Sequence, residues 1–186
     1  MARTPSKEAH DKVLSAALNL IAERGIEATS MDSIAAASGV SKATVYKHWA
    51  NKDALLIDVL RTHWDQLPEF NSGNPRKDMA ELLGYMAEAK RREELGPVWP
   101  RIIGYAASNP KFAKAMQEFA FEPRRLQIQR IIGEAARKGE LRDRIDAGLA
   151  TDLLIGPVMH RRFSGNKVSP DIIRQIVDYF WEVFRR

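Results

Sequence analysis

Helical periodicity runs through almost the whole chain, and it restricts the possible folds more than any other feature. Between Lys7 and Arg24 the apolar residues share one helical face: Val13, Leu14, Ala17, Leu18 and Ile21. Gly25 follows, where a glycine can end a helix in the left-handed conformation. Runs of β-branched residues are short, and no two-residue hairpin turn separates alternating segments. The sequence therefore predicts an all-α fold.

Glycine and proline residues divide the rest of the chain into further predicted helices. Three short helices follow the first, separated by Gly39 and by Ala50-Asn51, and the last runs from Lys52 to about Leu67. Residues 68–76 (PEFNSGNPR) are a predicted hinge. Beyond it we expect helices over residues 77–94, 97–108, 110–139, 146–164 and 170–185, the third kinked or split at Pro123.

Composition excludes several classes of protein. The 186 residues are 45% hydrophobic and 28% charged, which indicates an ordinary globular chain. The absence of cysteine excludes disulfides, zinc-thiolate sites and cysteine nucleophiles. No apolar run is long enough to span a membrane, and the first ten residues, MARTPSKEAH, contain no signal-peptide core. These features predict a cytoplasmic protein with no membrane contact.

Residues that could carry catalysis or bind a metal are scattered. The four histidines fall on different predicted helices, and none has a partner at ligand spacing. The acidic pairs Glu93-Glu94 and Asp143 with Asp146 stand where solvated charge is the ordinary state. We therefore expect no catalytic residue, no metal site, no cofactor and no enzyme activity.

Net charge suggests a nucleic-acid partner but places the excess outside the N-terminal region. The chain has 29 basic and 24 acidic residues, a net charge of +5. Residues 1–60 hold seven of each sign, so the whole surplus lies in residues 61–186. Evidence for DNA binding by the N-terminal region must therefore come from the placement of individual side chains and not from net charge.

Such placement is found in residues 29–56, TSMDSIAAASGVSKATVYKHWANKDALL. A helix-turn-helix requires a small residue where two short helices touch, a glycine at the turn, and apolar residues on either side. These positions are taken by Ala35, Gly39 and Val45, with Ile34 and Val40 between them. The same pattern could also be plain helix packing.

The second helix of this pattern has an outward face suited to DNA. At about 100° per residue, Val45 and Trp49 face inward, Ala43 and Lys47 face outward, and Thr44 and Tyr46 lie on the flanks. Ala43 allows close approach to a base, Lys47 can reach a guanine or a phosphate, and the two hydroxyl groups can bond phosphates. Ser41 is the expected N-cap, at a helix end whose free N–H groups attract phosphate, and Lys42 lies beside it. A merely solvated Lys47 remains an equal alternative.

About fifty N-terminal residues resemble the TetR family of transcriptional regulators. The family pattern is seen in residues 25–31 (GIEATSM), Ile34-Ala35, residues 39–49 (GVSKATVYKHW) and residues 51–56 (NKDALL). Ala43 departs from the frequent Gly or Pro and Trp49 from the commoner Phe, which leaves base preference open. The resemblance implies DNA contacts by Lys42, Thr44, Tyr46, His48 and Lys52, with Thr29 or Ser30. A half-buried packing role for His48 is an equal alternative.

The C-terminal half is similar to the effector domains of that family, through residues 138–142 (KGELR) with Asp146 and residues 156–159 (GPVM). Together with the predicted hinge, this likeness implies a three-helix DNA-binding domain over residues 1–52, a connecting helix and hinge over 53–76, and a larger ligand-binding and dimerisation domain over 77–186. It makes several middle residues candidates for contact with a small-molecule effector, although such residues are more often core: Met86, Trp99, Ile103, Met116 and Phe119.

The last helix carries an apolar stripe too broad for one seam within a subunit. With the family resemblance, this stripe predicts a homodimer joined by a four-helix bundle of residues 146–164 and 170–185, with a monomer as the alternative. The expected interface residues are Gly156, Met159, Phe163, Ile173, Ile176, Val177, Phe180, Trp181 and Phe184.

These features together predict a repressor that binds a palindromic double-stranded DNA operator as a homodimer and is released by a small-molecule effector. The alternative is a helical ligand-binding protein, or an unrecognised enzyme, whose N-terminal module is only structural.

Overall fold

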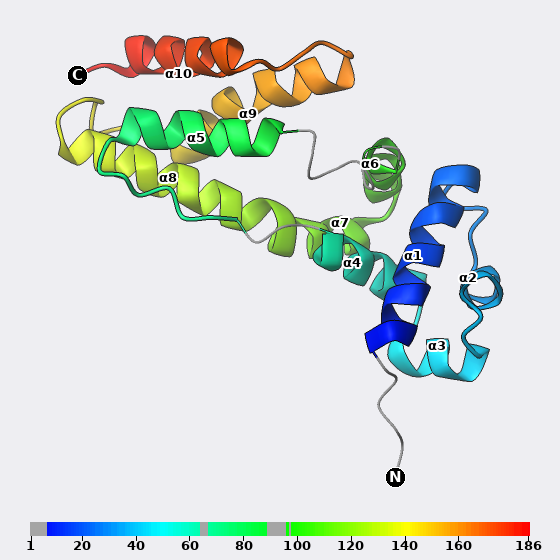
Figure 1. The fold of residues 1–186 in the computed structure, drawn as a ribbon. Coiled ribbons are helices and arrows are strands. Elements are labelled where there is room, and N and C mark those ends of the chain that lie inside the picture. Colours follow the sequence, from blue (N-terminus) through cyan, green and yellow to red (C-terminus); the bar gives the residue numbers. More distant parts are fainter. Residues whose placement is uncertain (1–6, 64–66, 89–95, 97) are drawn as a thin grey trace. The chain divides into compact units, whose positions relative to one another are not determined.

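The computed structural model describes residues 7–63, 67–88, 96 and 98–186. The elements in these ranges are helices, apart from an isolated antiparallel bridge between Leu141 and Arg185, so the all-α prediction is confirmed. Figure 1 shows their order: α1 (Lys7–Arg24), α2 (Met31–Ser38), α3 (Lys42–His48), α4 (Lys52–His63), α5 (Pro75–Ala87), α6 (Trp99–Ser108), α7 (Pro110–Met116), α8 (Glu122–Arg137), α9 (Ala147–Phe163) and α10 (Pro170–Phe184).

Local signals set several of the helix boundaries. Helix α1 has its predicted bounds, and Gly25 after it has a φ of 89°, a left-handed conformation that costs glycine little. Helix α5 begins two residues earlier than predicted, because the Asn74 side chain caps the amide of Lys77 at 3.0 Å and Pro75 suits the first turn. It ends at Ala87, earlier than predicted. Residues 64–66, 89–94 and 97, which the predicted helices included, lie outside the described residues.

The predicted helix over residues 110–139 is split as expected near Pro123. A π-helical turn, Gln117–Phe121, separates α7 from α8, and Pro123 lies in the first turn of α8. Because proline has no N–H and its ring displaces a preceding carbonyl, the regular bonding pattern is interrupted just before it.

Contacts divide the chain into two compact units that do not follow the linear sequence. Of the described residues, unit 1 holds 7–63, 96 and 98–120, and unit 2 holds 67–88 and 121–186. This grouping differs from a division at residues 52 and 76, because α6 and α7 share a core with the N-terminal helices. No helix among the described residues has the length and hydropathy needed to cross a membrane.

The core of unit 1 supports the helix-turn-helix. Val13, Leu14 and Ile21 of α1 are buried with Ile34 of α2 and Val45 of α3. The same cluster continues into α4, α6 and α7, and its members there are Leu55, Leu56, Val59, Leu60, Trp99, Ile102, Ala106, Phe112 and Met116. The short helices α2 and α3 are therefore held in place by burial against longer ones.

Unit 2 is a packed set of helices in which α5 contacts α8, α9 and α10 (Figure 1). Its buried side chains come from all four helices and include Met79, Leu82, Ile128, Ile131, Leu154, Val158, Val177 and Trp181.

The segment predicted as a hinge begins unit 2 and is tied to it by polar contacts. The fully buried carboxylate of Asp78 accepts bonds from the amide and hydroxyl of Ser72, the latter at 2.6 Å. Arg130 of α8 donates to the carbonyl of Phe70 at 2.5 Å, and Lys138, just after α8, donates to that of Gly73. The unit boundary falls at residues 66 and 67, just before this Pro- and Gly-rich stretch.

Candidate functional site

Helices α2 and α3 form the predicted helix-turn-helix (Figure 1). Ser30 and Ser33 cap the start of α2 reciprocally, each side chain accepting from the other residue's amide at 3.0 to 3.1 Å. Gly39 ends α2 with a φ of 68°. A Cβ there would meet no atom within 4 Å, so the turn requires glycine for its backbone conformation and not for space.

The outward face of α3 has the composition predicted from helical angles. Val45 is fully buried and Trp49 nearly so, which fixes the helix on the core of unit 1. The remaining side chains are exposed, apart from a half-buried Thr44; they are Lys42, Ala43, Tyr46, Lys47 and His48. His48 is exposed and lies beside the Trp49 ring, with centroids 5.5 Å apart. Small, cationic, hydroxyl and aromatic groups thus share one surface, and their contact with DNA stays a prediction.

Polar contacts already organise this surface in the free chain. Ser41 caps the amide of Thr44 at 3.2 Å, and the two hydroxyl oxygens lie 2.8 Å apart. Asp32, in the first turn of α2, accepts from Lys42 Nζ at 2.7 Å and from the Tyr46 hydroxyl at 3.3 Å. The Lys42 hydrogen bond lowers the pKa of Asp32, and the same bond raises the pKa of Lys42.

Two of the predicted DNA-contact residues make internal contacts instead of lying on the α3 surface. Thr29 is 2% exposed, and its hydroxyl donates to the carbonyl of Gly25 at 2.7 Å. Lys52 is half-buried; its Nζ donates to the carbonyl of Ile26 at 2.7 Å and lies 5.8 Å from the centre of the Tyr105 ring. Of the alternatives Thr29 and Ser30, Ser30 is the exposed one.

A second polar cluster anchors the end of α3 and was not predicted from the sequence. One oxygen of Asp58 on α4 lies 2.8 Å from His10 Nε2 of α1 and accepts from the Trp49 indole at 2.9 Å. The rings of His10 and Trp49 are 5.2 Å apart. Tryptophan at position 49 could have suggested a buried acceptor, because a buried indole N–H needs one.

The residues predicted to contact an effector are distributed over both units. Met86 belongs to the core of unit 2. The other four lie in or against the core of unit 1: Trp99, Ile103, Met116 and Phe119. Phe119 is also covered by the Arg61 guanidinium, 5.7 Å from its ring centre. Their role in effector binding stays a prediction.

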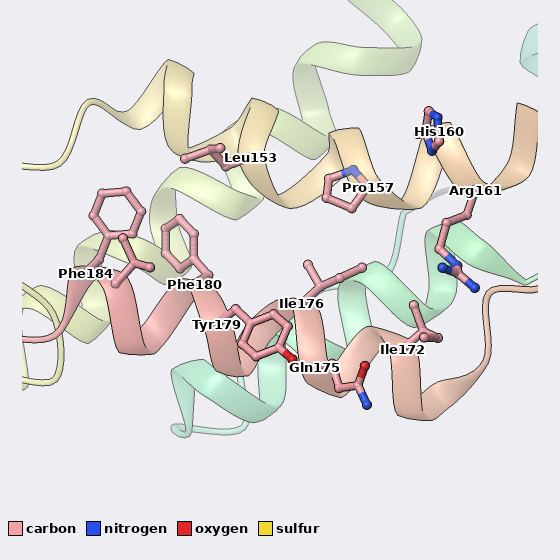
Figure 2. A pocket seen from close by; sticks show the side chains of 11 residues that line it. Leu153, Pro157, His160, Arg161, Ile172, Gln175, Ile176, Tyr179, Phe180 and Phe184 are labelled. Atoms are coloured by element: carbon pink, nitrogen blue, oxygen red, sulfur yellow. The ribbon is translucent and has the colours of Figure 1, made fainter. Parts of the chain in front are cut away.

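Helices α9 and α10 carry an apolar surface, which we call the α9–α10 face. Two of its residues, Ile172 and Ile176, are half-buried, and the others are exposed: Leu149, Leu153, Pro157, Phe163, Tyr179 and Val183. A hollow of about 510 Å³ lies in this face. Figure 2 shows its lining, with Leu153, Pro157 and His160 of α9 opposite Ile176 and Phe180 of α10.

The predicted interface residues fall on two sides of these helices. Gly156 and Phe163 are exposed, and Met159, Ile176 and Phe184 are half-buried. The others are buried in the unit 2 core: Ile173, Val177, Phe180 and Trp181. The prediction did not include three exposed residues of the same helices, Leu153, Tyr179 and Val183, although Tyr179 and Val183 continue the helical spacing of Ile172 and Ile176.

Acidic residues and histidines in the described ranges do not gather into a metal site: no group of three or more metal-binding side chains is found there. Asp146, one of the acidic residues considered in the sequence, caps α9 by accepting from the Leu149 amide at 2.7 Å.

Comparison with known proteins gives a consistent family. Residues 13–59 match the family described as bacterial regulatory proteins of the tetR family, and residues 71–180 match the tetracyclin repressor-like C-terminal domain. The chain is 35% identical to the HTH-type transcriptional regulator YdeS of Bacillus subtilis, over 90% of this chain and 85% of that protein. It is 25% identical to the DNA-binding transcriptional repressor TetR of Mycobacteroides abscessus, over 89% and 88% of the two chains.

The fold is similar to that of SmeT in its triclosan complex, with a TM-score of 0.72, 22% identity, and coverage of 96% of this chain and 92% of that one. The relatives from Bacillus subtilis and Mycobacteroides abscessus are transcriptional regulators, as the sequence predicted. The chain belongs to the TetR family of helix-turn-helix transcriptional regulators.

Proposed function

We propose that this protein is a repressor that binds a palindromic DNA operator as a homodimer and leaves it when a small molecule binds. The observation that carries the proposal is the outward face of α3, where Lys42, Ala43, Tyr46 and Lys47 stand exposed on a helix fixed by buried Val45. In a two-fold dimer, two such helices enter successive major grooves about 34 Å apart. This function would place the protein in the cytoplasm with the DNA.

The DNA-binding proposal is tested by selecting from a random duplex pool with the purified full chain. We expect a palindrome, and we expect Lys42→Ala with Tyr46→Ala to weaken its binding at least tenfold in a gel-shift titration, as about 1.4 kcal/mol of lost contact implies. Lys77→Ala, which removes an exposed cation of unit 2, is the control. A folded double variant that binds like the wild type contradicts the assignment. Binding of a metabolite without any DNA binding favours the alternative of a ligand-binding protein.

The dimer proposal is supported by the α9–α10 face. Exposed apolar area of this kind is unusual on a monomer and is removed from water when two copies pair. The predicted Phe180 and Trp181 are buried within the unit. Their replacement by Glu would therefore disrupt the subunit core, and the outward side chains are the informative ones.

Two matched leucines test the dimer. Leu153 on the α9–α10 face is 47% exposed, and Leu126 on α8 is 53% exposed. We expect Leu153→Glu to halve the molar mass measured by light scattering, because it places a charge in the interface. Leu126→Glu serves as the control and should leave the mass unchanged. A dimer that survives Leu153→Glu contradicts the use of this face.

Release by an effector is supported by the fold similarity to SmeT, whose complex contains triclosan. Triclosan is a first probe: added to the protein on its selected operator, it should lower the fluorescence anisotropy of the labelled DNA. Met116→Ala, which opens space in the unit 1 core, should shift the midpoint of that titration if Met116 lines the site. An unchanged midpoint removes Met116 from the ligand residues.

A further inference from the structure

Asp32 places a negative charge on the surface where DNA phosphates are expected. Its carboxylate is half exposed and holds the two donors of α3, with Lys42 Nζ at 2.7 Å on one oxygen and the Tyr46 hydroxyl at 3.3 Å on the other. A carboxylate in that position makes the same kinds of hydrogen bond that a phosphate would make. The donors predicted to recognise DNA are thus bonded to an anion of the chain itself.

Lys42 and Tyr46 differ in the number of hydrogen atoms that they can donate. A lysine ammonium has three N–H groups, so Lys42 can keep Asp32 and still donate to a phosphate. A tyrosine has one O–H, which Tyr46 gives to Asp32. Tyr46 must therefore leave Asp32 before it can donate to DNA, while Lys42 can bridge the two anions.

We propose, building on the proposed DNA-binding function, that Asp32 is an affinity-setting residue that competes with DNA phosphate for Lys42 and Tyr46. The competition acts on duplex of any sequence, because phosphate contacts carry no base information. It also fits the equal numbers of acidic and basic residues in positions 1–60. An unbalanced cation on α3 would strengthen attraction to all DNA, and Asp32 reduces that attraction.

The exchange is feasible because the Asp32–Lys42 pair is exposed. Side-chain exposure is 51% for Asp32 and 62% for Lys42, so neither charge must be desolvated in order to separate them. Exposed pairs of this kind are weak and are screened by salt. A phosphate can therefore displace the carboxylate from Tyr46 without disturbing the packing of α2 and α3.

The first test is Asp32→Asn in the full chain, measured by fluorescence anisotropy on a labelled duplex of scrambled sequence and on the selected operator. Asparagine keeps the shape and one acceptor oxygen but removes the charge. We expect binding to both duplexes to tighten about two- to fivefold at low salt, and the slope of log affinity against log salt to steepen by about 0.9. Glu23→Gln, which neutralises an exposed carboxylate in the last turn of α1, is the matched control and should leave the slope unchanged.

The second test combines Tyr46→Phe with the first variant. If Asp32 and phosphate compete for the single O–H, the loss of that O–H weakens DNA binding more in Asp32→Asn than in the wild type. Equal losses in the two backgrounds overturn the competition at Tyr46. Unchanged or weaker binding by folded Asp32→Asn overturns the inference while the proposed function stands, and a wild-type protein that binds no duplex overturns both.

Discussion

The two surfaces proposed to act on partners, one in each unit, use opposite chemistry. The α3 surface of unit 1 presents polar and charged groups, several of which are already bonded to other groups of the unit, as Lys42 and Tyr46 are to Asp32. The α9–α10 face of unit 2 presents apolar side chains, such as Leu153, Tyr179 and Val183, around a hollow of about 510 Å³.

The difference shows what each partner requires. Hydrogen bonds to DNA depend on direction, so the donors must be held at defined positions, and buried Val45 and Trp49 with the Asp58 cluster fix the helix that carries them. Association of apolar surfaces depends mainly on area and fit, so a broad exposed face is sufficient. We therefore expect unit 1 to be sensitive to the loss of single polar contacts and unit 2 to changes of apolar surface.

Phe112→Ala gives the largest expected effect and tests whether the two units unfold independently. Phe112 is 1% exposed in the core shared by α6, α7 and the N-terminal helices, and the cavity should cost about 3–5 kcal/mol. Hydrogen exchange should quicken in α1 and α4 more than in α10. Leu126→Ala, at a 53% exposed position on α8 outside the α9–α10 face, should change stability by less than about 0.5 kcal/mol. Equal quickening in both units would show that they unfold as one.

Asp58→Ala tests the dependence of unit 1 on its polar cluster. The change leaves the Trp49 indole and His10 without the carboxylate and should cost about 1–3 kcal/mol in urea unfolding. Asp178→Ala, which removes an exposed ion pair with Arg76 in unit 2, should cost at most about 1 kcal/mol. A similar cost for the two variants argues against any special role of the Asp58 cluster.

Two glycine replacements should act in opposite directions in the two units. Gly39→Ala forces a left-handed conformation on alanine and should cost about 1–2 kcal/mol. Gly156→Ala lies within α9, where a Cβ meets no atom within 4 Å, and should stabilise the subunit by about 0.5–1 kcal/mol. If Gly156 lies where two copies cross, the same variant should weaken dimerisation. Thermal unfolding measures the change in stability, and the molar mass measured by light scattering reports the change in dimerisation.

Apart from the controls, Tyr105→Phe should give the smallest loss of stability, and this loss should depend on pH. The Tyr105 hydroxyl donates to Asp53 at 2.8 Å, and its loss should cost about 0.5–1.5 kcal/mol at pH 7. Burial, with the bond to Asp53, raises the pKa of Tyr105 from 10.0 to about 12. The unfolded chain therefore loses this proton first, so the contribution of Tyr105 is complete below pH 10 and falls as the pH approaches 12.

The measurement for Tyr105 is urea unfolding of both proteins at pH 7 and above pH 10. The stability gap between wild type and Tyr105→Phe should narrow at the higher pH. A gap that stays constant with pH contradicts the coupling to Asp53.

The helix-turn-helix was accessible from the sequence because its determinants are local. Gly39 has the predicted turn role, Ser30 and Ser41 cap the two helices, and the inward positions of Val45 and Trp49 follow from a 100° step. The all-α class follows in the same way from periodicity. The side-chain partners were not accessible: Asp32 is ten residues from Lys42, and His10 is 48 residues from Asp58, so no local pattern joins them.

The C-terminal half shows what the apolar periodicity of a helix cannot predict. Periodicity identified α10 as a helix with excess apolar surface but could not say which half of that surface faces inward. The packing of α10 on α5 and α9 buries Ile173, Val177 and Trp181 and leaves Tyr179 and Val183 outside. Periodicity also could not show that Met86 and Met116 belong to different units. Tertiary contacts place Met86 in the core of unit 2 and Met116 in the core of unit 1.

The sequence by itself determined the helices, the turn at Gly39, the composition of the α3 surface and the family, because each depends on residues close together in the chain. Only the tertiary structure decided that α6 and α7 join the N-terminal core, that Thr29 and Lys52 make internal contacts, and that Asp32 and Asp58 hold the two ends of α3. The physical reason is that burial and long-range hydrogen bonds depend on which helices meet, and periodicity fixes the apolar face of a helix without naming its neighbour.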